Sequence, residues 1–111
     1  MDYKDCYELI KNKFMEQDMS AVGGNFSALL YLTGQQESGY IYAAYIDGCK
    51  IIEPVRHPNV NIFASMTISI FEKIITQQLD PFRAFTTGQI KTKGNVMLAL
   101  SLYNTLKQSG N

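Results

Sequence analysis

The amino-terminal residues show the hydrophobic spacing of a helix with one buried side. Apolar positions recur at i, i+3, i+4, i+7 and i+11, and they are occupied by Tyr3, Cys6, Tyr7, Ile10 and Phe14. Asp2 is placed to cap this helix, because its carboxylate can accept hydrogen bonds from the free N–H groups of the first turn. The pattern predicts a helix that ends near Asp18, before the two glycines at residues 23–24 that interrupt regular structure.

Strand-like segments with a period of two follow. Residues 26–33 and 40–46 carry apolar side chains on both faces, which indicates an adjacent pair of strands inside a sheet. The Asp-Gly dipeptide at 47–48 is a hairpin signal, since both positions of that turn need a positive φ, and it returns the chain into residues 50–55. Pro54 lacks an N–H group, so we expect this third strand at an edge of the sheet.

The next segments predict a fourth strand and a second helix. Residues 60–66 alternate apolar and polar positions, as in a strand with one buried face. Thr67 or Ser69 can cap a helix that runs to about Gln78, before the Asp-Pro dipeptide at 80–81. The apolar side of that helix consists of Ile70, Phe71, Ile74 and Ile75.

The carboxy-terminal part predicts one more strand and a final helix. Residues 88–93 alternate as a half-buried strand does, and Gly94-Asn95 turns the chain and caps the helix. The expected order is α-β-β-β-β-α-β-α. Hairpin-linked strands with helices at both ends predict an α+β fold, a five-stranded and largely antiparallel sheet covered by helices.

The final helix is apolar in nearly all directions. Every residue from 96 to 100 is apolar, and Leu102, Tyr103 and Leu106 follow. A helix that packs against one partner needs only one apolar stripe. We therefore expect this helix to take part in the function.

The last third of the chain resembles a known family of lipid-binding domains. The shared residues are Leu79-Asp80-Pro81, Ala84-Phe85, Gly88-Gln89-Ile90-Lys91, Gly94-Asn95 and Leu98-Ala99-Leu100. Their spacing looks like the signature of the sterol carrier protein 2 (SCP-2) family, "l-D/N-P-x-x-A-F-x-x-G-K-L/I-K-I-x-G-D/N-x-x-L-A-x-x-L". The resemblance implies an SCP-2-like fold with an apolar tunnel between sheet and helices. Such tunnels accept fatty acids, acyl-CoA esters, phospholipids or sterols.

The resemblance also implies a set of lining residues, carried over by position. Phe85 has the strongest claim, because it stands in the Ala-Phe pair of the signature. The expected lipid-binding residues are Met66, Phe71, Ile74, Leu79, Phe85, Ile90, Met97, Leu98 and Leu102. A close-packed core and a tunnel lining use the same residue types, so the pattern leaves both roles open.

The chain departs from the family just after its second helix. Members commonly have Gly at that point, whereas this chain has Gln77 and Gln78. A Gln in a left-handed cap costs about 1 kcal/mol, unless the helix ends differently. We expect the mouth of the tunnel to be reshaped there.

Composition and charge indicate one domain and exclude some partners. The 111 residues are 46% hydrophobic and suit a single domain over residues 1–111. Ten basic and ten acidic side chains give no overall field for nucleic acid or an anionic membrane. Acidic residues are absent beyond Asp80, while Arg83, Lys91, Lys93 and Lys107 follow. These cations are either solvated edges or a weakly basic rim for lipid headgroups or an acidic partner.

The longest apolar run, residues 40–46, is far shorter than the roughly twenty residues of a membrane-spanning helix. The first residues are polar, with acidic members, so they do not resemble a signal peptide. We expect a soluble, cytoplasmic protein that makes at most transient contact with membranes.

Catalytic chemistry has few candidates in this chain. His57 is the single histidine and lies in a predicted loop, where we expect it to be solvated. Cys6 and Cys49 lack the close spacing of a metal or redox pair. Asp47 and Asp80 are explained as turn and helix-end residues. We expect no enzyme, no metal and no cofactor.

Two functions remain open after the sequence is read. The first is a carrier that holds a fatty acid, acyl-CoA, phospholipid or sterol without making or breaking a bond. The second is an interaction module with a filled interior, which forms a homodimer or binds a partner enzyme.

Overall fold

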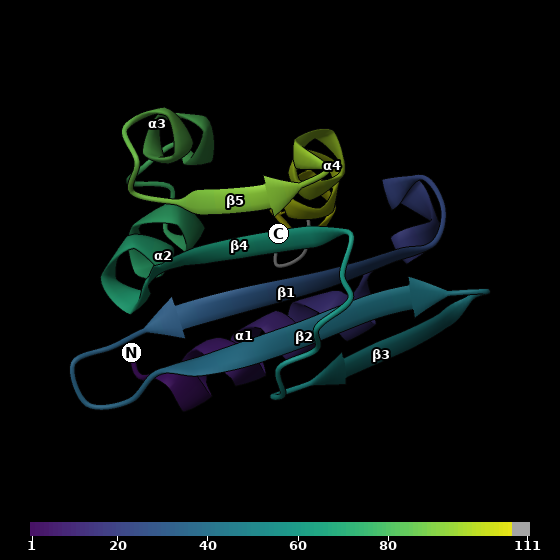
Figure 1. The fold of residues 1–111 in the computed structure, drawn as a ribbon, viewed down its shortest axis with the longest axis horizontal. Helices are drawn as coiled ribbons and strands as arrows, with labels where there is room; N and C mark the ends of the chain where they lie inside the picture. The colour runs from purple at the N-terminus through teal and green to yellow at the C-terminus, as the bar shows by residue number, and fades with distance from the viewer. Residues whose placement is uncertain (108–111) are drawn as a thin grey trace.

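A five-stranded mixed sheet forms the centre of the molecule (Figure 1). The computed structural model describes residues 1–107. The strands lie in the order β3-β2-β1-β4-β5, and every neighbouring pair is antiparallel except β1 and β4. Their bounds are β1 (Phe26–Thr33), β2 (Gly39–Ile46), β3 (Cys49–Glu53), β4 (Ile62–Thr67) and β5 (Lys91–Gly94). The expected α+β fold, with β1 beside β2 in the interior and β3 at an edge, is confirmed.

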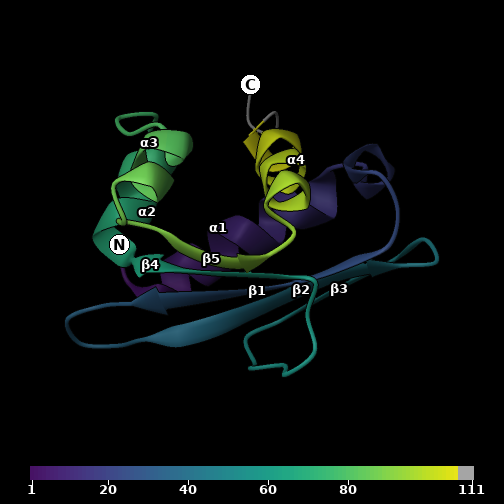
Figure 2. The ribbon, with the colours of Figure 1, turned by 45° about the horizontal axis from the view of Figure 1, so that its top comes forward.

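The helices gather on one face of this sheet (Figure 2). In chain order they are α1 (Tyr3–Glu16), the 3-10 helix η1 (Met19–Val22), α2 (Ile68–Ile75), α3 (Pro81–Thr86) and α4 (Val96–Lys107). The α2–α3 pair and α4 stand over the same part of the sheet with a separation between them, and α1 lies behind both. This arrangement places apolar helix faces opposite each other.

Polar side chains set the starts of the helices as the sequence predicted. Asp2 and Asp5 form a reciprocal capping box at α1. The Thr67 hydroxyl accepts from the N–H of Ile70 at 3.1 Å, so Thr67 caps α2 and Ser69 does not. Asn95 Oδ1 accepts from the N–H of Leu98 at 3.0 Å. Local chemistry therefore placed these boundaries correctly.

Two short helices, η1 and α3, were not predicted from the sequence pattern. Asp80 and Pro81 were interpreted as the end of the preceding helix, but they also begin α3. The Asp80 carboxylate accepts from the N–H of Arg83 at 3.2 Å, and Pro81 occupies the first helical position, where its missing N–H costs nothing. Helix α2 ends at Ile75, before the left-handed backbone of Gln77, and β5 starts at Lys91, so both elements are shorter than predicted.

The sheet face that lies away from the helices is also partly covered. Leu29, Tyr42 and Ala44 are buried there, and the loop between β3 and β4 lies against them (Figure 2). The His57 ring stacks on the Tyr42 ring with centroids 4.5 Å apart. The expectation that His57 is solvated was wrong, because this stacking half-buries the imidazole. The loop explains why the first two strands are apolar on both faces.

Candidate functional site

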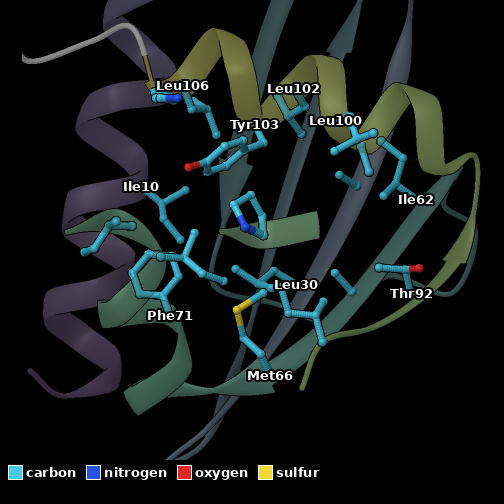
Figure 3. Close-up of a pocket in the computed structure, with 18 of the residues that line it drawn as sticks. Ile10, Leu30, Ile62, Met66, Phe71, Thr92, Leu100, Leu102, Tyr103 and Leu106 are labelled. Carbon is cyan, nitrogen blue, oxygen red and sulfur yellow. The ribbon is translucent and has the colours of Figure 1, made fainter. Parts of the chain in front are cut away.

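An apolar cavity of about 410 Å³ lies between the sheet and the helices. Figure 3 shows side chains from β1, β4 and β5 on one side, and from α1, α2 and α4 around the rest. The labelled lining residues are Ile10, Leu30, Ile62, Met66, Phe71, Thr92, Leu100, Leu102, Tyr103 and Leu106. A volume between about 300 and 1,000 Å³ is typical of small-molecule sites. The cavity can therefore hold an apolar ligand.

The all-round apolar character of α4 has two causes in the structure. One side of the helix, with Leu98, Leu102 and Leu106, packs against the buried cluster that contains Phe14 and Met19. Another side, with Leu100 and Tyr103, lines the cavity. A single helix thus closes the core and walls the cavity, which needs apolar residues in more than one direction.

The rim of the cavity is apolar and exposed. Phe82 and Phe85 on α3 and Val96 on α4 line the cavity, although 59%, 39% and 37% of these residues' surfaces remain accessible. Exposed apolar residues that gather in one patch, rather than singly, are typical of sites that meet a ligand or partner. These residues give the cavity an apolar side that is open to solvent.

Polar groups are few among the lining residues, and two of them show features that need an explanation. Gln77 has a left-handed backbone with φ of +63°, which favours glycine. Burial raises the pKa of the Tyr103 phenol, and the Asp80 carboxylate adds to that shift. The remaining polar side chains that line the cavity are Lys13, Thr92 and Lys107.

The structure places the expected site residues in four locations. Met66, Phe71, Ile74, Phe85, Ile90 and Leu102 line the cavity. Leu79 lines a neighbouring cleft, Leu98 packs in the core, and Met97 is 73% exposed. These last three do not line the cavity. Met97 and Leu98 are neighbours on α4 whose side chains point in different directions from the cavity-lining ones, and Leu79 lies in the segment between α2 and α3.

Sequence reasoning missed lining residues on α1, α3 and α4. Ile10 belongs to the apolar stripe of α1, which looked like ordinary core. Leu100 and Tyr103 lie three residues apart and share one face of α4, a spacing that could have identified them. Phe82 could not be assigned, because the short helix α3 was not predicted.

The described residues offer little for catalysis or metal binding. Burial raises the pKa of the Cys6 thiol to about 11, so the reactive thiolate is scarce at neutral pH. Within residues 1–107, His, Cys, Asp and Glu side chains form no group of three or more that could bind a metal ion. Over the same range no helix is long and apolar enough to span a bilayer.

A match to a protein-family model shows to which family this chain belongs. The family model described as the SCP-2 sterol transfer family matches residues 30–107. The chain belongs to this family. SCP-2 domains are in general non-catalytic modules, and membership supports a general role in lipid binding or transfer.

Solved structures of SCP-2 domains share the fold. Sterol Carrier Protein 2 from Yarrowia lipolytica, in its apo form, superposes with a TM-score of 0.73 at 18% identity, covering 96% of this chain and 90% of that one. A palmitated SCP2L2 from Aedes aegypti gives a TM-score of 0.74 at 15% identity, covering 96% and 95% of the two chains. A double mutant of the sec-alkyl sulfatase PisA1 gives 0.75 at 16% identity, but only 17% of that chain is covered. Comparison with curated protein sequences found no significant match.

Proposed function

We propose that this SCP-2 domain is a lipid carrier that holds one acyl chain or similarly sized apolar ligand in the cavity, without catalysis. The observation that carries this proposal is the cavity of about 410 Å³ with predominantly apolar walls. The likeness to a palmitated SCP-2 domain supports an acyl ligand. The ligand's apolar part contacts Met66, Phe71, Ile74, Phe85, Ile90 and Leu102.

The binding energy of such a carrier comes from removing hydrocarbon from water. Each buried methylene contributes about 0.8 kcal/mol, so a long acyl chain gains several kcal/mol before the entropic cost of binding is subtracted. This source of affinity needs no charged residue in the cavity. It also selects for chain length more strongly than for chemical detail.

A titration tests the carrier function. Delipidated protein is titrated with a fluorescent long-chain fatty acid, and acyl-CoA and sterol are then added as competitors. Saturable binding at one site supports the carrier, and the order of competition identifies the ligand class. A flat titration, with the protein still folded by circular dichroism, would refute it.

The exposed rim favours a second candidate, an interaction module. Phe82 is 59% exposed and Met97 is 73% exposed, and both belong to helices beside the cavity. In this alternative the apolar rim meets a second copy of the chain or a partner enzyme. A ligand-free dimer in sedimentation, which Phe82→Ser dissociates, would favour the module over the carrier.

A further inference from the structure

A second hollow adjoins the main cavity and differs from it in chemistry. We call it the polar cleft; its volume is about 280 Å³, and it lies between the segment joining α2 to α3 and the second half of α4. Its hydrogen-bonding side chains belong to Gln77, Asp80, Tyr103, Asn104 and Lys107. Gln77, Tyr103 and Lys107 also line the main cavity, so the two hollows share a wall. The two hollows are therefore adjacent, as a ligand with its chain in one and its head group in the other would require.

Gln77 lines both hollows and has a backbone conformation that is unfavourable for residues with a side chain. Its φ of +63° is left-handed, a region that glycine adopts without a steric penalty. This backbone ends helix α2, since the N–H groups of Gln77 and Gln78 donate to the carbonyls of Ile74 and Lys73 at 3.1 and 2.8 Å, and it leaves Gln77 beside both hollows. The amide of Gln77 can both donate and accept a hydrogen bond at the junction.

The charges of the polar cleft balance. Of the described residues that line it, Asp80 is acidic and Lys107 is basic. Lys13, the other lysine at the main cavity, lies on α1 and does not line the cleft. An ionised carboxylate entering the cleft would lose hydration without a net attraction in return. Gln77, Tyr103 and Asn104 are neutral and hydrogen-bond equally well to an uncharged group.

We propose that the polar cleft binds the uncharged, hydroxyl-bearing head group of a single-chain lipid, whose acyl chain fills the main cavity. Gln77, Tyr103 and Asn104 are the hydrogen-bonding partners of the head group. This inference rests on the proposed carrier function and adds a ligand class to it. It predicts that the protein binds a monoacylglycerol-like lipid more tightly than a free fatty acid with the same acyl chain.

Two probes with the same acyl chain test this preference. Delipidated protein loaded with a fluorescent fatty acid is titrated with 1-monooleoylglycerol and, separately, with oleic acid at pH 8. We expect the monoacylglycerol to displace the probe with about two- to tenfold higher affinity, as one net hydrogen bond provides. Micelle formation is avoided by working below the critical concentration of each lipid.

Three variants test whether the head group contributes to binding separately from the acyl chain. Gln77→Gly should weaken the binding of monooleoylglycerol about two- to tenfold. The thermal midpoint should not fall, because glycine adopts the left-handed backbone without a steric penalty. Gln78→Gly is the matched control, since Gln78 is exposed and lines neither hollow. Asp80→Asn keeps a capping oxygen and should shift the affinity ratio about two- to fivefold towards oleate.

Two results would overturn the inference while leaving the carrier intact. One is equal or tighter binding of oleate by the wild-type protein. The other is that Gln77→Gly lowers the affinity for monooleoylglycerol no more than Gln78→Gly does. Failure of both lipids to bind the wild-type protein would overturn the carrier function and, with it, this inference.

Discussion

Filling the cavity from the sheet side should abolish most lipid binding and leave the fold intact. Ala64 on β4 is half-buried, lines the cavity and pairs with Leu30 of β1 and Thr92 of β5. Ala64→Ile directs three more carbon atoms into the cavity, and the β-branched side chain suits a strand. Displacing about three ligand methylenes at about 0.8 kcal/mol each costs about 2.4 kcal/mol, or about 50-fold in affinity.

Stability should respond differently from affinity. Extra methylenes in a close-packed core cost about 1 to 3 kcal/mol, but here they enter space that is free. The thermal midpoint of Ala64→Ile should therefore stay unchanged or rise. The matched control is Leu98→Ala, which truncates a half-buried side chain in the core and should cost about 2 kcal/mol while affinity is retained.

The assays are a fluorescent fatty-acid titration and a thermal melt on the same protein samples. The two variants should give opposite outcomes. Ala64→Ile should lose affinity and keep its stability, and Leu98→Ala should lose stability and keep its affinity. If Ala64→Ile lowers the midpoint by several degrees and binds fatty acid normally, the space beside Ala64 is not the ligand site.

Three further predictions concern single residues. Phe85→Ala should cost only about 1 kcal/mol of stability in a urea melt, because Phe85 is 39% exposed and faces the cavity; a loss above about 3 kcal/mol would mean that it packs in the core. Gly94→Ala should prevent stable folding or lower the midpoint by more than 10 °C in circular dichroism, roughly the effect of 2 kcal/mol, since φ is +95° and a Cβ atom would clash with the Asn61 carbonyl oxygen; a normal melt would contradict this. Cys6 should make the free energy of unfolding fall as pH rises from 9 towards 11. Its thiol has an ordinary pKa of 9.0 and a folded pKa of about 11, so the unfolded chain releases the proton first; Cys6→Ala should flatten this slope in urea melts, and an unchanged slope would assign it to another group.

The elements that sequence reading predicted well are those with local causes. The pattern predicted β1 with both bounds correct, and Asp2 and Asn95 as helix caps. Alternation, turn dipeptides and caps depend on neighbouring residues alone, so they can be read without the fold. The short helix α3 was missed because six residues give too little periodicity to detect.

The division between core and cavity wall was beyond sequence reading. Leu98 and Leu102 are leucines on one helix, yet Leu98 packs in the core and Leu102 also lines the cavity. Met97 looked like a lining residue and is 73% exposed. Nothing in the side chain itself separates these roles, because they depend on how α4 is rotated over the sheet and on where along the helix each residue lies.

The amino-acid pattern alone predicts the order of the strands along the chain, the α+β class and the excess of apolar surface on α4. Tertiary structure decided that α2–α3 and α4 stand apart over the sheet, and that separation is what makes the cavity. It also brought Lys107 to the same polar cleft as Gln77 and Asp80, which lie far from it in the sequence. Local patterns indicate which side chains avoid water. An unfilled space depends instead on the distances between whole helices and strands after they have packed.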